Sequence, residues 1–172
     1  GDNSLASALN ATATGAYSTA SGVNSTANGF SSLASGESSF AGGDNATASA
    51  QSSTALGDNS LANALNSTAT GAYSTASGVN STANGFSSLA SGESSFAGGD
   101  NALANSQSST ALGDNSQAIN TNATATGAYS TASGLNSTAN GYSSLASGES
   151  SFEGGDNALA NSQSSTALGD NS

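Results

Sequence analysis

A seven-residue pattern runs through the whole chain and limits what it can fold into. We number its positions one to seven, so that residues 18–24 (STASGVN) are one heptad. Residues 4–171 hold 24 heptads, in which position one is always Ser or Ala, position three is Ala in 23, and position five is Gly in 18. Heptads are typical of coiled coils, but each internal glycine costs a helix about 1 kcal/mol and the two apolar seams are missing. The pattern therefore excludes a coiled coil.

The composition favours either disorder or a fold with a very small core. Only 21 of the 172 residues are Leu, Ile, Val or Phe, and the 11 acidic groups are accompanied by no Lys, Arg or His. Low apolar content with charge of one sign is typical of intrinsic disorder. Disorder explains the composition but not the strict placement of Ala and Gly, so it stands as the alternative to an ordered repetitive fold.

Alternation within each heptad predicts a short β-strand. In a strand, positions one, three and five face one side, and positions two and four face the other. The first set is small almost throughout, whereas the second varies between Leu, Thr, Phe, Asn and Ser. Small residues suit the interior of a flat coil, and Gly at position five with Asn, Asp or Ser after it suits the turn. The sequence therefore predicts an all-β parallel solenoid with two heptad strands in each 14-residue coil, or about 12 coils.

A longer repeat groups the heptads by eight. Units 1–56, 57–112 and 113–168 each begin with Gly-Asp-Asn-Ser, and the same four residues return at 169–172. Self-similarity at a fixed period is the signature of a repeat architecture. We expect residues 1–172 to form a single repetitive β-roll segment, a slice of a longer array.

The paired heptads resemble the head repeats of the YadA-like trimeric autotransporter adhesins. The likeness lies in the spacing Ser-x-Ala-x-Gly, repeated every seven residues and paired every fourteen, as in residues 66–85 (NSTATGAYSTASGVNSTANG). The resemblance implies a left-handed parallel β-roll with three chains side by side. It also implies display on a bacterial cell surface, outside the cell, for binding to host matrix or other cells.

Alternate heptads carry an apolar residue that suits a contact between chains. In every second heptad, counted from the one that begins at Ser4, position two is Leu in seven of twelve cases. Where Gln117 replaces this Leu, Ile119 appears two positions later. We predict a contact face here, in a homotrimer or a side-by-side fibre, with sequence drift in a surface strand as the alternative.

Aromatic residues recur once per unit and would either plug such a seam or anchor a partner: Tyr17, Tyr73 and Tyr129, and Phe40, Phe96 and Phe152.

The residue types exclude several classes of function. Without His, Cys or Lys, the Ser hydroxyls have no ordinary base and no thiolate is available, so we expect neither catalysis nor a cofactor. Without Lys or Arg, no basic patch can bind nucleic acid or an anionic membrane. No apolar run approaches the roughly 18 residues of a membrane span.

Pairs of Asp residues 14 apart are the one candidate for a metal site. Their spacing should stack them at the same corner of adjacent coils, where oxygen ligands would suit Ca²⁺. The glycine-rich calcium repeat of other solenoids is absent, and solvated carboxylates with diffuse counterions are the alternative. The sequence leaves both open for Asp44 with Asp58, Asp100 with Asp114, and Asp156 with Asp170.

Glu153 is the single exception in the Ala column at position three. A carboxylate in a narrow interior would have to be neutral, with a raised pKa, or the strand would have to bulge to release it. Because Gly154 and Gly155 follow directly, we expect a bulge at 152–155 that is absent at 96–99, with Glu153 reaching solvent.

The function predicted from the sequence is a non-catalytic structural or adhesive segment of a bacterial surface adhesin or extracellular fibre. Its expected partners are other copies of itself and host matrix or another cell surface. An ice-binding solenoid is the alternative, because Thr recurs at position two of the remaining heptads, although Phe interrupts this row at every fourth coil.

Overall fold

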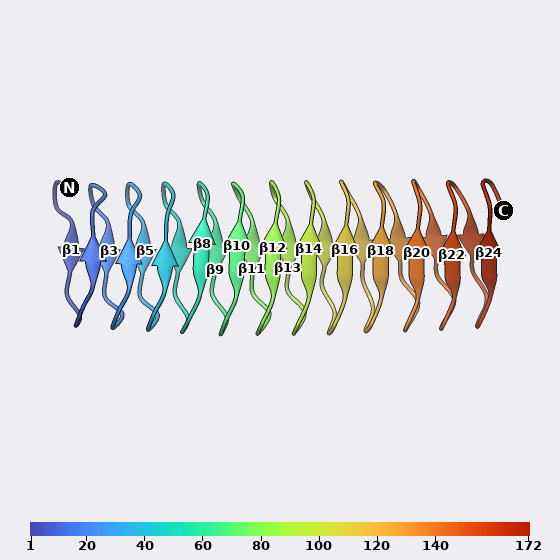
Figure 1. Cartoon of the computed structure of the whole chain (residues 1–172), viewed down its shortest axis with the longest axis horizontal. Coiled ribbons are helices and arrows are strands. Elements are labelled where there is room, and N and C mark those ends of the chain that lie inside the picture. Colours follow the sequence, from blue (N-terminus) through green and yellow to red (C-terminus); the bar gives the residue numbers. More distant parts are fainter.

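The computed structural model describes residues 1–172 and consists of 24 short strands joined by turns. Each coil, made of two heptads, contributes one strand to each of two 12-stranded parallel sheets. The coils stack in one direction from the N- to the C-terminus (Figure 1). The chain forms no helix able to cross a membrane. The predicted parallel β-solenoid with two heptad strands in each coil is confirmed.

Every strand begins at position two of its heptad. The odd sheet contains β1 (Leu5–Ala6), β3 (Thr19–Ala20), β5 (Leu33–Ala34), β7 (Thr47–Ala48), β9 (Leu61–Ala62), β11 (Thr75–Ala76), β13 (Leu89–Ala90), β15 (Leu103–Ala104), β17 (Gln117–Ala118), β19 (Thr131–Ala132), β21 (Leu145–Ala146) and β23 (Leu159–Ala160). The even sheet contains β2 (Thr12–Ala13), β4 (Thr26–Ala27), β6 (Phe40–Ala41), β8 (Thr54–Leu56), β10 (Thr68–Thr70), β12 (Thr82–Asn84), β14 (Phe96–Gly98), β16 (Thr110–Leu112), β18 (Thr124–Thr126), β20 (Thr138–Asn140), β22 (Phe152–Gly154) and β24 (Thr166–Leu168).

Hydrogen bonds between consecutive coils hold the strands in register. Each strand pairs with the strand of the next coil, so that Thr68 lies beside Thr82. The N–H of position two donates to the carbonyl of position one in the next coil, as from Leu61 to Ser74 (2.9 Å). At the corners, the N–H of position seven donates to position six of the preceding coil, as from Tyr73 to Asp58 (2.8 Å). The ladder therefore continues around the whole coil.

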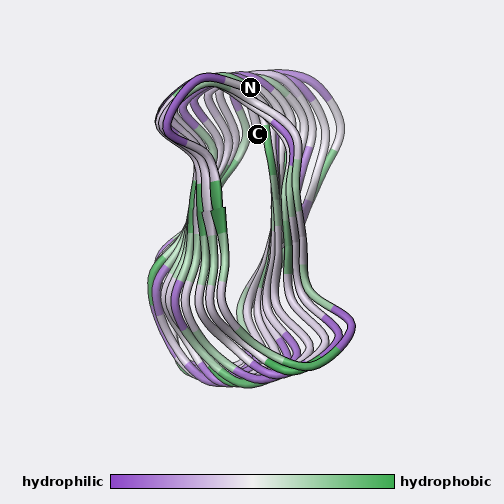
Figure 2. Ribbon diagram, turned by 90° about the vertical axis from the view of Figure 1, so that its left-hand side faces the viewer, coloured by the Kyte–Doolittle hydropathy of each residue, from purple (hydrophilic) through white to green (hydrophobic).

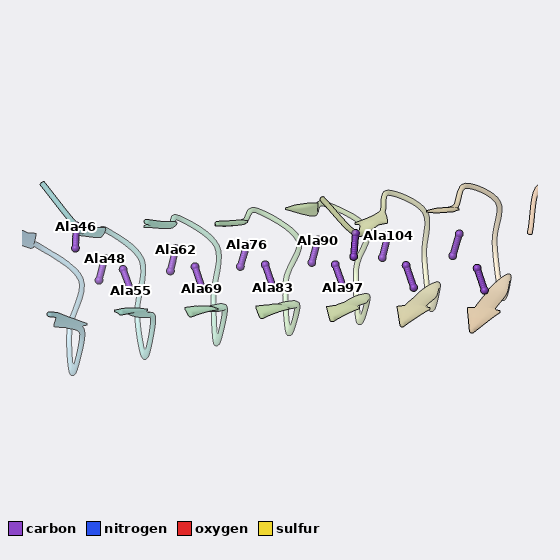
Figure 3. Packing of buried hydrophobic residues seen from close by; sticks show 14 of the residues in the cluster. Ala46, Ala48, Ala55, Ala62, Ala69, Ala76, Ala83, Ala90, Ala97 and Ala104 are labelled. Carbon is purple, nitrogen blue, oxygen red and sulfur yellow. The ribbon is translucent and has the colours of Figure 1, made fainter. Parts of the chain in front are cut away.

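Alanine side chains at position three fill the narrow space between the two sheets. Seen along its axis, the roll is flattened, with the sheets facing each other (Figure 2). Ala62 and Ala76 of the odd sheet point toward Ala69 and Ala83 of the even sheet (Figure 3), and all four are fully buried. Most of the Ser residues at position one are buried beside them. The predicted interior of small residues is confirmed.

The corners depend on position seven, which is among the residues that the sequence predicted to make the turn together with Gly at position five. Every residue at position seven has a φ between 52° and 61°, in the left-handed region. The N–H of the next position one donates to the carbonyl of position five, as from Ser81 to Gly78 (3.1 Å). This closes a turn whose third residue is left-handed, as in a type II turn. Asn and Ser occupy position seven except at three tyrosines, because Asn tolerates this backbone well.

The glycines of position five lie close to the backbone of the next coil. A Cβ atom on Gly71 would lie 2.6 Å from the carbonyl oxygen of Gly85, and one on Gly78 would lie 2.0 Å from that of Gly92. After even strands, position five is Gly in all twelve heptads, and from Gly57 onward its φ is also positive. After odd strands its φ is not positive, and Ala, Ser or Asn replaces Gly in six of twelve heptads.

Glu153 lies inside the roll, so the prediction of a bulge that carries it to solvent is wrong. Strand β22 pairs with β20 in the same register as β14 pairs with β12, and Glu153 is fully buried beside Ala139. Its Oε2 accepts a hydrogen bond from the N–H of Asn140 (3.0 Å), whereas its Oε1 has no partner. The strand keeps its register and buries the carboxyl group, so breaking the backbone hydrogen bonds of the ladder would cost more free energy than burying Glu153.

Burial raises the pKa of the Glu153 carboxyl above its ordinary value of 4.5. The hydrogen bond from the N–H of Asn140 opposes this rise in pKa, and the charge of Asp156 adds to it. The other outcome expected from the sequence, a carboxyl with a raised pKa, is therefore the one that the structure supports.

Replacing Glu153 should stabilise the chain at neutral pH. Glu153→Ala, which restores the residue found at Ala97 in the second unit, is expected to raise the free energy of unfolding by about 1–3 kcal/mol, because a partly unsatisfied buried group is removed. The melting temperature followed by circular dichroism checks this. A lower melting temperature for Glu153→Ala would contradict the assignment of position three to the interior.

The same carboxyl should make stability depend on pH. Since its pKa is higher in the folded than in the unfolded chain, its stabilising contribution is complete below pH 4.5 and is lost as the pH rises through the folded-state pKa. The melting temperature of Glu153→Gln should therefore exceed that of the wild type by a margin that grows with pH. Parallel pH profiles for the two proteins would show that Glu153 is not desolvated.

Candidate interaction surfaces

All seven Asp residues of the chain lie along one edge of the roll. We call this row the even edge. It consists of positions six and seven of the heptads that contain the even strands, together with Asp2 and Asn3 at the start of the chain. Two coils with aromatic side chains alternate along it with two coils that carry Asp. Its residues at position six are, in order, Asp2, Ala16, Phe30, Asp44, Asp58, Ala72, Phe86, Asp100, Asp114, Ala128, Tyr142, Asp156 and Asp170.

The paired Asp residues stack in adjacent coils, as their spacing predicted. Asp58 Oδ1 accepts a hydrogen bond from the N–H of Asp44 (3.4 Å), and Asp44 Oδ1 accepts one from the N–H of Phe30 (3.3 Å). The second and third units repeat both contacts. The backbone N–H groups at position six donate to no backbone carbonyl. Each Asp carboxylate therefore accepts a hydrogen bond from an N–H group that would otherwise have no partner within the chain.

These pairs do not assemble a larger group of ligands. No three carboxylates lie close enough together to hold a metal ion, and the surface has no pocket. Each place therefore offers Ca²⁺ two carboxylates, and the Oδ1 atom of each already accepts a backbone hydrogen bond. Within the chain, each carboxylate accepts the N–H of position six in the preceding coil.

Exposed aromatic rings form one pair in each unit of the even edge. Tyr73, at position seven, meets Phe86 of the next coil edge to face, with ring centroids 5.7 Å apart. The two residues are 56% and 48% exposed, so about half of the surface of each is available to a partner. The recurrence of the tyrosines was visible in the sequence, but their pairing was not, because each partner ring belongs to the next coil. Equivalent pairs are Tyr17 with Phe30 and Tyr129 with Tyr142.

The outer face of the odd sheet presents the predicted apolar row. Leu33 and Leu89 are half-buried between the side chains of neighbouring coils, and Leu145 is exposed. Gln117 and Ile119 both lie exposed on the same face. Further exposed apolar residues follow in the corners after the odd strands: Leu9, Val23, Leu65, Val79 and Leu135.

The phenylalanines of the even sheet lie flat against their own strands. A Cβ atom on Gly42 would lie 2.6 Å from Phe40 Cε1 and 2.8 Å from Leu56 Cδ2. The missing side chain of Gly42 therefore makes room for the ring, which Leu56 of the next coil covers from the side. The same arrangement recurs around Gly98. Every four coils, a flat apolar patch of Phe therefore interrupts the row of Thr at position two on the outer face of the even sheet.

The sequence and the fold were compared with known proteins. The family model of the YadA head domain repeat matches residues 1–18, 20–46, 48–74, 76–102, 104–130, 132–152 and 155–172. A comparison with curated protein sequences gave no match. Among solved structures, the collagen-binding domain of the Yersinia adhesin YadA is similar, with a TM-score of 0.53 and 24% identity over 92% of this chain and 69% of that one. This structural likeness supports the fold alone. The family model covers nearly every residue, and the chain therefore belongs to the YadA head domain repeat family.

Proposed function

We propose that this chain is a stiff, non-catalytic adhesive segment of a bacterial surface adhesin. The observation that carries the proposal is the match of the YadA head repeat across almost the whole chain, on a roll of uniform coils. Head domains of this family are extracellular, exposed parts of surface adhesins. Neither the family nor its solved relative supports the ice-binding alternative.

The fold suits adhesion because it separates structure from contact. Positions one and three are nearly constant and buried, whereas positions two, four and six vary and face outward. Outward side chains can therefore change without altering the coil. Because the surface has no pocket, we expect a protein ligand to bind across a flat surface of the roll.

An extracellular matrix protein is the first ligand class to test, since the similar solved domain is described as collagen-binding. Displayed on a non-adherent bacterium, the chain should retain cells on collagen-coated glass but not on albumin-coated glass. The matched control replaces Gly57, Gly71 and Gly85 with Val, whose side chains would collide with the next coil, and should abolish retention. Equal retention by both chains would refute adhesion through the folded roll, and no retention of the wild type would refute collagen as its ligand.

We also propose that the chain associates with copies of itself, as a homotrimer, through the outer face of the odd sheet. Leu side chains there are only partly covered by their own coil, and burying apolar surface favours association by about 25 cal/mol per Å². The half-buried Leu33 and Leu89 lie four coils apart on this face, so a parallel neighbour would meet them in register.

Changing Leu33, Leu89 and Leu145 to Asp should dissociate the assembly, because burying several unpaired carboxylates costs several kcal/mol each. Light scattering should then report the mass of one chain in place of three. Thr26, Thr82 and Thr138, which face outward on the even sheet, provide the control: their change to Asp should leave the mass unaltered. An unchanged mass in the Leu variant would leave the odd face without this role.

A further inference from the structure

We propose that the even edge is a docking surface for a basic, extended protein segment. In this proposal the Asp pairs bind Lys or Arg side chains, and the aromatic pairs between them contact the same segment. The inference deepens the adhesive function proposed above, because it states the chemistry of one partner. It rests on the composition of the edge, the free atoms of its side chains and the charge of the chain.

The even edge carries more charge and more exposed aromatic surface than the opposite edge. It holds seven of the 11 acidic residues. It also holds every ring of the three exposed aromatic pairs. The opposite edge carries Leu, Val, Glu, Gln and Thr at position six and no aromatic residue. The pattern of two aromatic coils and two Asp coils recurs every four coils, or about 19 Å at the spacing of strands in a sheet.

The side chains of this edge have unused binding capacity. Asp44 and Asp58 are exposed, and each uses only Oδ1 in a hydrogen bond within the chain. Since Asp44 Oδ1 binds the backbone N–H of Phe30, the carboxylate sits next to the residue that bears a ring of the pair. A cation held by such a carboxylate lies within reach of the ring, where exposed cation–π contacts are favourable.

Nothing in the fold requires these rings. Tyr17, Tyr73 and Tyr129 are the only residues other than Asn and Ser in the left-handed position seven, which disfavours bulky side chains. The corners at Asp44 with Asn45 and at Asp58 with Asn59 carry no aromatic residue, and Asn45 and Asn59 have the same left-handed φ (55° and 56°). The corner therefore forms without an aromatic side chain, and the rings are available for a partner.

The charge of the chain decides which partner fits. A second copy carries a net charge of −11 and no Lys, Arg or His, so it would repel this edge. Nucleic acid and anionic lipid are repelled for the same reason. A protein segment rich in Lys or Arg supplies the missing cations and gains both carboxylate and ring contacts.

The edge also sets the form of the segment. Each coil adds one side chain at position six to a single row, which an extended chain can follow. At about 3.3 Å per residue, an extended chain covers the repeat of about 19 Å in about six residues. A peptide with a pair of Arg residues every six positions, in a Gly and Ser background, is the probe of this spacing.

The first arm of the test removes the charges of the even edge. Asp44→Asn, Asp100→Asn and Asp156→Asn keep the Oδ1 acceptor of each side chain and should weaken binding of the labelled peptide at least about tenfold. Changing Glu37, Glu93 and Glu149 on the opposite edge to Gln removes the same charge and should leave the affinity nearly unchanged. Equal losses in the two triple variants would show diffuse attraction and overturn the proposal.

The second arm removes rings without unfolding the corner. Tyr17→Asn, Tyr73→Asn and Tyr129→Asn install the residue that this backbone prefers, so the melting temperature should stay the same or rise. Peptide affinity should fall about tenfold, because three cation–π contacts are lost. Unchanged affinity in this variant would contradict the role of the rings.

A control peptide with citrulline in place of Arg should not bind, since it keeps the shape but lacks the charge. Failure of the Arg peptide to bind the wild-type chain would refute docking at the even edge. The result stays distinct from the adhesive function, because cells that display the chain would still be retained on collagen if only the edge proposal is wrong.

Discussion

Backbone hydrogen bonds between equivalent positions of consecutive coils are the interaction on which the structure depends. The chain has 126 backbone hydrogen bonds, and most of them join one coil to the next. The two sheets that this ladder builds lie close together. They can do so because the interior contains little but Ala and Ser. Large apolar side chains would separate the sheets, and a shift in register would turn the small residues outward.

The ladder also determines where specific side chains can occur. Position five lies against the carbonyl group of the next coil and excludes a Cβ atom after even strands. Position seven is left-handed and selects Asn or Ser. Positions two, four and six remain for contact with other molecules, so the Leu row, the flat Phe patches and the even edge are independent surfaces on one scaffold. An adhesive protein can vary each of them separately.

Periodicity predicted the coil, the interior and the stacking of Asp44 on Asp58, because these follow from spacing alone. The choice of the left-handed residue did not follow, since Gly at position five and Asn at position seven both suit a turn. Glu153 was assigned to solvent because sequence reasoning weighed the cost of a buried carboxyl without the cost of breaking the register. The ring pairs were missed because Tyr73 and Phe86 are neighbours only once the direction of each corner is known.

Amide hydrogen exchange on chains labelled only at Phe and Val tests the ladder most directly. The N–H groups of Phe40 and Phe96 donate to the carbonyls of Ser53 and Ser109 in the next coil (2.9 Å each), whereas those of Val23 and Val79, at position six, donate to none. The account predicts slow exchange for Phe40 and Phe96 and fast exchange for both valines. Fast exchange at all four amides, or equal protection of Val and Phe, would contradict a roll held together by bonds between coils.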